Sequence, residues 1–320
     1  MDGLTRRILY ILVSLILFFT NDFYGQQAPV FTHHYNSLMF SNPAFAGMRE
    51  GICVNGIYRQ QWAGFKDING DVVSPQDFLL TVDSPVRLLH GGVGGSIIQD
   101  KIGQQSDIVV QLDYAFHTNL SIGTLGIGAG LNIVNRSIDF TKYEAGGADP
   151  LLDGLSNESD MKLDASFGLF LSQPGQYYFG VSVTNLLESR FKKFEQSDGE
   201  VPTTDRTFYV TGGYNFVLPN NPLFEIEPSV FILSDLASTQ YNVSATVKYN
   251  DKFWGGLNYR FQESIGVMVG MRFKDFRISY AYDINMMQLS VPGSHEVFLG
   301  YCFKIKGDRS RTSYKNTRYL

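Results

Sequence analysis

Short stretches in which apolar and polar residues alternate recur along most of the chain. In residues 276–284, for example, apolar side chains occupy every even position and polar or small ones every odd position. A period of two residues is typical of a β-strand that has one face in an apolar environment. We count fourteen such segments, at about 52–61, 76–83, 91–100, 107–117, 121–136, 162–172, 176–185, 206–217, 222–233, 240–249, 252–262, 265–274, 276–285 and 295–304, and no helical periodicity of useful length.

The lengths of these segments and of the gaps between them indicate a membrane barrel. Most segments have 8 to 12 residues, close to the roughly 9–11 of a tilted transmembrane strand. The odd-numbered gaps, such as 137–161 and 186–205, are generally longer than the even-numbered gaps, such as 218–221 and 250–251, although the short gap 263–264 breaks this rhythm. Outer-membrane barrels have short periplasmic turns and longer outer loops. We therefore predict an all-β fold, a transmembrane antiparallel β-barrel of about 14 strands; a soluble sandwich would alternate similarly but lack the loop rhythm.

Composition agrees with a barrel and excludes other classes. Charged residues make up 18% of the chain, below the roughly 25% of soluble domains, and aromatic residues make up 14%. The mean hydropathy of −0.08 is too polar for a helical membrane protein, whereas a barrel averages lipid-facing apolar residues with polar lumen residues. Because the net charge is −5, we expect no nucleic-acid partner.

The N-terminus predicts export. Arg6 and Arg7 precede an apolar run at 8–19, which is shorter than the roughly 20 residues that span a bilayer. We expect a signal peptide over residues 1–25; an uncleaved anchor helix is the alternative. We expect the rest of the chain to consist of a periplasmic or plug segment at 26–50, the barrel at 51–304 and a basic periplasmic tail at 305–320. This predicts the outer membrane of a Gram-negative bacterium, with both termini in the periplasm.

The inward faces of the predicted strands carry charges of both signs but no catalytic pattern. The acids are Asp77, Asp83, Asp113, Asp164, Glu225, Glu227, Asp283 and Glu296, and the bases are Arg59, Lys162, Lys248, Arg260, Arg272 and Arg277. A closed, salt-bridged interior and a selective channel both remain open. The five His residues are scattered, and the glycine runs at 91–95 and 126–130 lie within strand patterns, where glycine relieves crowding. We expect no enzyme, metal or cofactor.

The two cysteines lie on the strands that would close the barrel. Cys53 is near the start of the first strand and Cys302 near the end of the last, and both fall on the inward face. These strands are antiparallel neighbours in a closed barrel, and the periplasm is oxidising. One hypothesis is a disulfide across the seam, the junction between the first and last strands. The other is that the two cysteines are buried thiols, out of register by two residues.

A turn motif precedes the first predicted strand, and a second motif lies at the end of that strand. Asn42, Pro43, Ala44, Phe45, Ala46 and Gly47 are followed by Tyr58, Arg59, Gln61, Trp62 and Gly64. Pro43 pushes Asn42 toward extended geometry, and Gly47 permits a sharp turn, so residues 26–47 would enter the base of the barrel. Trp62 falls at the opposite end of strand one, where an aromatic belt would anchor the barrel in lipid; contact with a partner is the alternative.

This combination resembles the start of the PorP/SprF family of outer-membrane proteins of the type IX secretion system. SVTNLL at 182–187 and SHEVFLGYCF at 294–303 agree with the resemblance, while the extension 304–320 and the long loop 66–75 depart from it. The resemblance implies a non-enzymatic role in type IX secretion or gliding. It implies as partners outer-membrane lipid, the periplasmic ring or motor proteins and a secreted surface adhesin. It points to Asn42, Pro43, Phe45, Gly47, Tyr58, Arg59 and Trp62 as partner candidates. A passive or fatty-acid-type channel is the alternative function.

Overall fold

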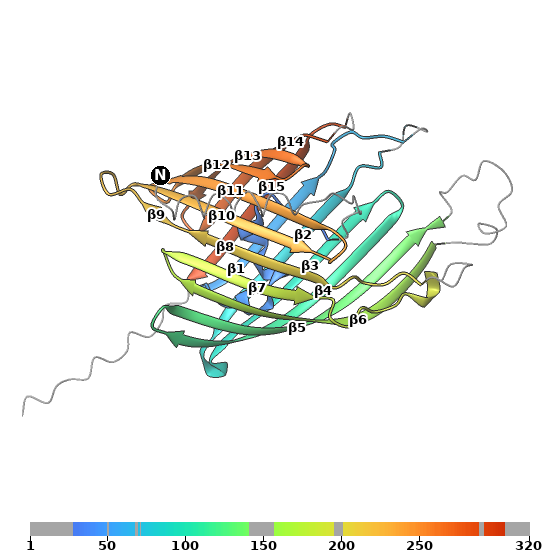
Figure 1. Ribbon diagram of the computed structural model, residues 1–320, viewed down its shortest axis with the longest axis horizontal. Coiled ribbons are helices and arrows are strands. Elements are labelled where there is room, and N and C mark those ends of the chain that lie inside the picture. The colour runs from blue at the N-terminus through green and yellow to red at the C-terminus, as the bar shows by residue number, and fades with distance from the viewer. Residues whose placement is uncertain are drawn as a thin grey trace, which may run out of the picture.

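The strands form a single antiparallel sheet that closes on itself (Figure 1). The computed structural model describes residues 28–49, 51–67, 70, 72–140, 157–194, 201–287 and 291–304. The strands are β1 (Gly51–Gln60), β2 (Gln76–Val86), β3 (Gly91–Ile102), β4 (Gln105–Leu120), β5 (Gly123–Asp139), β6 (Asn157–Gln173), β7 (Tyr177–Thr184), β8 (Thr207–Tyr214), β9 (Phe216–Val217), β10 (Phe224–Ser234), β11 (Thr239–Tyr249), β12 (Phe253–Arg260), β13 (Ser264–Phe273), β14 (Phe276–Asn285) and β15 (Ser294–Lys304).

The barrel has fourteen strands around its wall. β8 and β9 both pair with β10 and are separated only by Asn215, so the fifteen named strands supply fourteen positions. β1 pairs with β15, and β10 pairs with β11, which closes the ring. Each predicted segment overlaps one position in the wall, so the predicted fold class is confirmed. The main difference is β6, which begins at Asn157 because the polar residues before Lys162 continue to pair with β5, for example Asp160 with Arg136.

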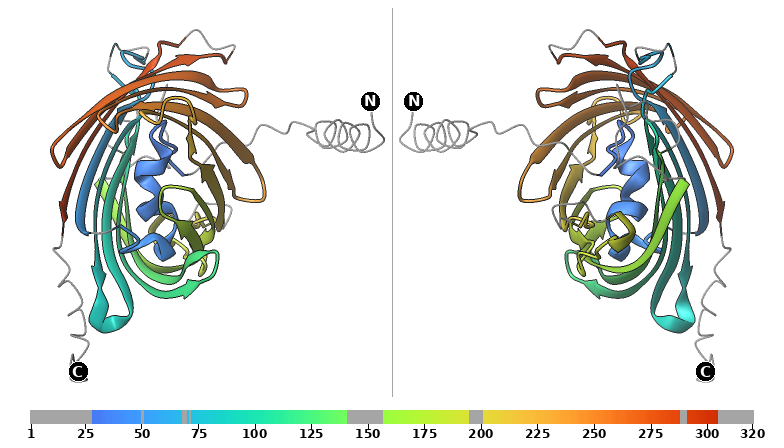
Figure 2. Two further views of the ribbon diagram at one scale, coloured as in Figure 1. Left: turned by 90° about the vertical axis from the view of Figure 1, so that its left-hand side faces the viewer. Right: turned by 90° about the vertical axis from the view of Figure 1, so that its right-hand side faces the viewer.

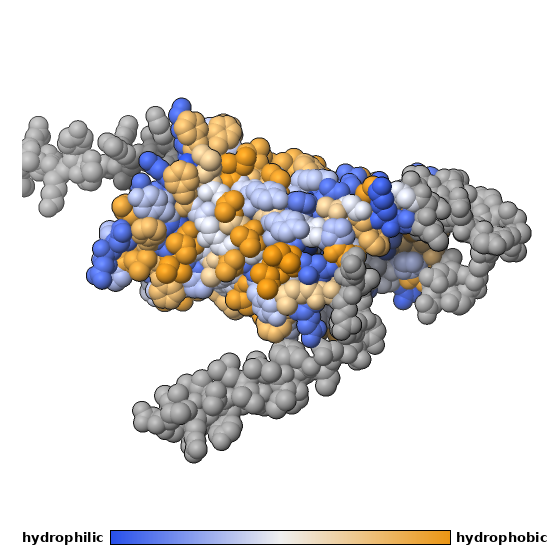
Figure 3. All heavy atoms as spheres, turned by 90° about the horizontal axis from the view of Figure 1, so that it is seen from above, coloured by the Kyte–Doolittle hydropathy of each residue, from blue (hydrophilic) through white to orange (hydrophobic). Residues whose placement is uncertain are grey.

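The two faces of the wall differ in polarity as the alternation predicts. Large apolar side chains point outward and are exposed, among them Val267, Val269, Met271, Ile278 and Leu299. Figure 3 shows such residues gathered over the middle of one side of the barrel, with polar residues toward its two ends. The inward positions carry buried polar groups. This arrangement suits an outer surface that contacts acyl chains.

Residues 28–49 lie inside the ring of strands (Figure 2). They form the short helices η1 (His34–Ser37), α2 (Leu38–Ser41) and η2 (Pro43–Phe45). Val30, Phe31, Leu38, Met39 and Phe45 are buried against the strands. We call residues 28–49 the lumen segment. No helix in the described ranges is long and apolar enough to cross a membrane.

The connection from β7 to β8 folds over one end of the lumen. The polar composition of residues 186–205 is typical of a solvated loop, yet part of this connection is buried. Phe191, just before η5 (Lys192–Phe194), and Phe194, its last residue, are buried against Val134 of β5. Asp164 accepts hydrogen bonds from Leu187 N (2.9 Å) and Thr204 Oγ1 (2.8 Å). We call this the long-loop end and the opposite end the short-turn end. The predicted signal peptide, the tail 305–320 and the tip of the β5–β6 loop fall outside the described residues.

Candidate functional site: the filled lumen and the barrel seam

The turn at Asn42–Gly47 is set by its own sequence. Asn42 has an extended backbone, and its side-chain oxygen accepts a hydrogen bond from Ala44 N (2.9 Å). Pro43 follows as the first residue of η2, where its missing N–H costs nothing and its fixed φ suits the helical turn. Gly47 has φ +69°, a conformation that strains residues with a Cβ. The residues of the turn are therefore sufficient to specify its conformation without contacts to the barrel wall.

Asn42 also fastens the lumen segment to the wall. Its Nδ2 donates to the carbonyl oxygens of Leu169 (3.1 Å) and Val181 (3.4 Å), which lie opposite each other on β6 and β7. Beside it, Ser182 Oγ donates to Ser41 O (2.6 Å). One buried amide thus satisfies both the turn and two strands, and each such bond contributes about 0.5–1.5 kcal/mol.

Glycines in the wall make room for the lumen segment. A Cβ at Gly128 would lie 2.3 Å from Ala44 N, and a Cβ at Gly92 would lie 2.3 Å from Ala46 O. Such distances allow no side chain at either position without displacing the backbone of the segment. Gly92 and Gly128, which lie in the glycine runs at 91–95 and 126–130, therefore have a role that the sequence did not reveal: they face the Asn-Pro-Ala-Phe-Ala-Gly turn.

Apolar side chains fill the same part of the lumen. Leu38 and Met39 are fully buried, and Phe45 packs edge-on against Phe170 with ring centroids 5.1 Å apart. Burial of a side chain of this size contributes about 1.5–3 kcal/mol. These three residues together outweigh any single hydrogen bond of the segment.

The first residues of the lumen segment contact a buried cluster of charges. Arg59 and Arg260 both donate to Val30 O, and both lie within 4 Å of Asp283 (3.6 and 3.8 Å). Thr32 Oγ1 donates to Asp283 Oδ1 (2.7 Å). The inward charges from β1, β12 and β14 therefore neutralise one another in part, and the segment adds hydrogen bonds to them.

His33 and His34 occupy different environments. His33 Nδ1 lies 2.6 Å from Glu296 Oε1, and His33 N donates to the same oxygen (2.8 Å). His34 Nε2 lies 3.0 Å from Ser229 Oγ. Burial lowers the pKa of His34 to about 4; the positive charge of Arg260 also lowers it, and Glu296 opposes the change. The His34 ring is thus held neutral inside the lumen.

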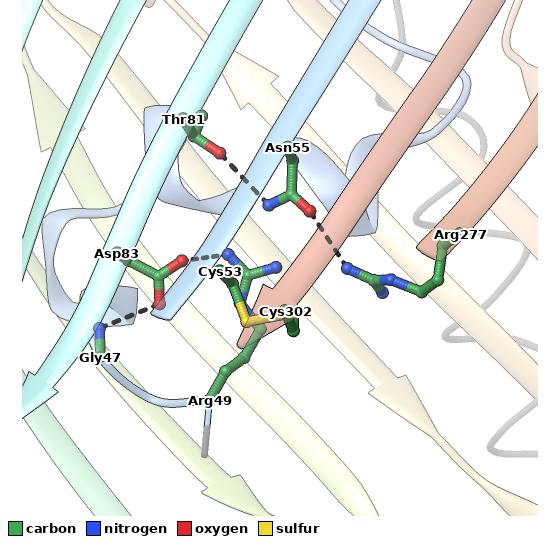
Figure 4. The surroundings of a disulfide bond; sticks show 8 residues. All are labelled: Gly47, Arg49, Cys53, Asn55, Thr81, Asp83, Arg277 and Cys302. Atoms are coloured by element: carbon green, nitrogen blue, oxygen red, sulfur yellow. Dashed lines mark hydrogen bonds and ion pairs between the residues drawn. A yellow bond between two sulfur atoms is a disulfide. The ribbon is translucent and has the colours of Figure 1, made fainter. Parts of the chain in front are cut away.

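A disulfide joins the first and last strands. Cys53 and Cys302 lie directly opposite each other in the β1–β15 register and are bonded in the structure (Figure 4). The alternative arrangement, out of register by two residues, is not the one observed. Beside the disulfide, Arg49 pairs with Asp83, which also accepts a hydrogen bond from Gly47 N (3.3 Å). The end of the lumen segment and the seam therefore meet at the short-turn end.

The residues of the opening motif do not converge on one site. Asn42, Pro43, Phe45 and Gly47 lie inside the barrel. Arg59 points into the lumen, whereas Tyr58 is 43% exposed on the outer face. Trp62 lies beyond β1 at the long-loop end, where its ring contacts Phe65 with centroids 6.3 Å apart. Sequence reasoning also missed Thr32 as a partner of Asp283, because only the closed barrel brings them together.

The described residues hold no cluster of side chains suited to a metal ion. No group of three or more His, Cys, Asp or Glu side chains in the described ranges is arranged to hold a metal ion. The geometry defines a membrane β-barrel whose lumen holds residues 28–49 of the same chain.

Comparison with known protein families assigns this chain to one of them. The model of the type IX secretion system membrane protein PorP/SprF family matches residues 23–301. The chain therefore belongs to that family and is an outer-membrane β-barrel component of type IX secretion. No curated protein matches the chain.

Comparison with solved structures finds outer-membrane proteins of low sequence identity. The Ralstonia pickettii toluene transporter TbuX is 13% identical with a TM-score of 0.51, over 84% of this chain and 94% of that chain. The Acinetobacter baumannii outer membrane protein Omp33 is 9% identical with a TM-score of 0.43, over 80% of this chain and 100% of that one. A Pseudomonas aeruginosa FadL homologue is 9% identical with a TM-score of 0.43, over 84% and 94%.

Proposed function

We propose that this protein helps to export or anchor a cognate secreted surface protein and links it to the periplasmic machinery of type IX secretion or gliding. The family match over residues 23–301 is the observation that carries this proposal. The filled lumen supports it, because a barrel that holds buried side chains at its centre suits an anchor better than a pore. In this role the protein catalyses no reaction and needs no cofactor.

The orientation in the membrane is part of the proposal. The end at which β1 begins and β15 ends faces the periplasm, and the folded β7–β8 connection faces the exterior. Both termini of the barrel wall then lie on the side from which the chain is inserted, and short turns face the periplasm as in other outer-membrane barrels. The outer loops would contact the secreted adhesin, and the short-turn end would contact the ring or motor proteins.

Crosslinking in intact cells tests the partners. A photoreactive residue at Leu88, which is 88% exposed in η3 (Arg87–Leu89), reports on the short-turn end, and one at Leu236, 77% exposed between β10 and β11, reports on the opposite end. We expect secretion-machinery proteins from the first position and a secreted surface protein from the second. Recovery of only lipopolysaccharide and general porins from both would contradict the proposal.

Deletion of the gene tests the function itself. Loss of one surface protein from the cell exterior, with other outer-membrane proteins unchanged, is the expected result. Unchanged secretion and gliding, together with stable ion conductance of the purified barrel, would favour the alternative of a passive or fatty-acid-type channel.

A further inference from the structure

A cavity at the short-turn end of the lumen is lined by basic and aromatic side chains. It has a volume of about 780 Å³ including the solvent at its mouth, and it lies between the lumen segment and strands β10 to β15. Lys248, Arg272 and Arg277 contribute its positive charges. Tyr35, Phe253 and Trp254 contribute aromatic surface. A lining that combines aromatic rings with positive charges suits an amphipathic ligand.

The three basic side chains differ in how they are neutralised. Lys248 pairs with Glu227, and Arg272 pairs with Asp251. Arg277 has no carboxylate within ion-pair distance among the described residues; its Nη2 donates to the neutral side-chain oxygen of Asn55 (3.1 Å, Figure 4). Its guanidinium also lies over the Phe298 ring, 5.4 Å from the centroid. Within the part of the chain that the structure describes, one charge at the cavity wall is therefore left without a counter-ion.

The register makes this charge harder to accommodate. Arg272 of β13 lies directly opposite Arg277 of β14, and like charges in that position are destabilising. A carboxylate is the natural partner of such a pair, because an Arg guanidinium binds it through two parallel hydrogen bonds. A neighbouring second hollow, which shares Tyr35, Glu227 and Lys248 with the first, extends the opening toward the β6–β7 turn. The cavity thus has space for more than one side chain of a ligand.

We propose that this cavity binds an acidic, aromatic-containing peptide segment of a periplasmic partner, with one carboxylate on Arg277. The proposal rests on the proposed function, since it supplies the contact between the barrel and the secretion machinery. A peptide is favoured over a small anion because aromatic rings line the cavity beside the charge, and because a second hollow adjoins the first at Tyr35, Glu227 and Lys248. The chain after β15 supports an acidic ligand: residues 305–320 contain five Lys or Arg and one Asp.

Peptide binding to the purified full-length barrel tests the proposal. The probe is a fluorescent, end-blocked peptide of alternating Glu and Tyr, and its counterpart carries Gln in place of Glu. We expect the Glu peptide to bind and Arg277→Gln to weaken it by about tenfold to hundredfold, the range for loss of a charge-assisted hydrogen bond. Arg277→Lys, which keeps the charge, should weaken it less. Arg206→Gln, at the long-loop end beside Glu188, is the matched control and should leave binding unchanged.

Several outcomes would overturn the proposal. These are equal binding by Arg277→Gln and the unaltered protein, equal binding of the Gln peptide, or displacement of the Glu peptide by dodecanoate at lower concentration than by unlabelled peptide. The heat-dependent mobility of each variant on a denaturing gel shows whether its barrel is folded. Secretion assays separate the two hypotheses: secretion that is lost on gene deletion but normal in Arg277→Gln cells refutes the cavity proposal alone. Normal secretion after deletion refutes the proposed function.

Discussion

The contact between Gly128 and the lumen segment gives a sharp test of how the lumen is filled. An added Cβ at Gly128 would lie 2.3 Å from Ala44 N, whereas ordinary contact begins at about 3.4 Å. Wall and segment must therefore separate by about 1.1 Å, the difference between these distances. Overpacking of this kind costs about 1–3 kcal/mol. Gly128→Ala should thus raise the undocked fraction of the segment by roughly 5- to 150-fold.

Labelling of an engineered thiol measures this change. Ser37 of the lumen segment is 4% exposed, and both native cysteines are bonded, so Ser37→Cys supplies one buried thiol. Its reaction with a maleimide should be faster by that same factor in the Gly128→Ala background. Gly95→Ala is the matched control, because its Cβ would meet only ordinary contacts, at 3.6 Å or more. Equal labelling rates of Ser37→Cys alone, with Gly128→Ala and with Gly95→Ala would refute the reasoning.

Three further predictions concern the seam, the buried histidine and the folded loop. Cys302→Ser frees Cys53 and should lower the free energy of unfolding by about 2–4 kcal/mol; unfolding in lipid vesicles by guanidinium, followed by tryptophan fluorescence, would show no shift of the midpoint if the bond were unimportant. Burial lowers the pKa of His34 from 6.5 to about 4, so the undocked segment binds a proton at a higher pH than the docked one. Docking should therefore weaken as the pH falls from 6.5 toward 4, by about 2 kcal/mol at pH 5. The maleimide labelling rate of Ser37→Cys should rise over this range, and it should change less with pH when His34→Gln is added. Asp164→Ala removes the acceptor for Leu187 N and Thr204 Oγ1 and should open the β7–β8 connection at a cost of about 1–3 kcal/mol; trypsin cleavage after Lys192 reports this, and unchanged cleavage would count against the role of Asp164.

The barrel wall could be predicted because each strand carries its own signal. Alternation in residues 265–274, 276–285 and 295–304 marked both the strands and their lipid-facing sides. The antiparallel pairing of the strands that carry Cys53 and Cys302 follows from the even number of strands, whereas the register that places them directly opposite each other does not. The start of β6 at Asn157 could not be seen, since its first residues alternate weakly and are held by pairing with β5.

The interior could be predicted only in part, because its contacts join residues far apart in the sequence. The turn at Asn42–Gly47 has a local signal in Pro43 and Gly47. The fit of Ala44 against Gly128, and of Thr32 against Asp283, depends on wall positions that no local pattern specifies. The inward burial of Phe191 was missed for the same reason, since its loop is polar in composition and is held by the distant Asp164.

The central claim, a barrel whose lumen is closed by its own residues 28–49, is tested most directly by conductance in planar lipid bilayers. The account predicts that the intact, folded protein gives no stable open channel and that deletion of residues 28–47 gives one. Stable conductance of the intact protein, unchanged by the deletion, would contradict it.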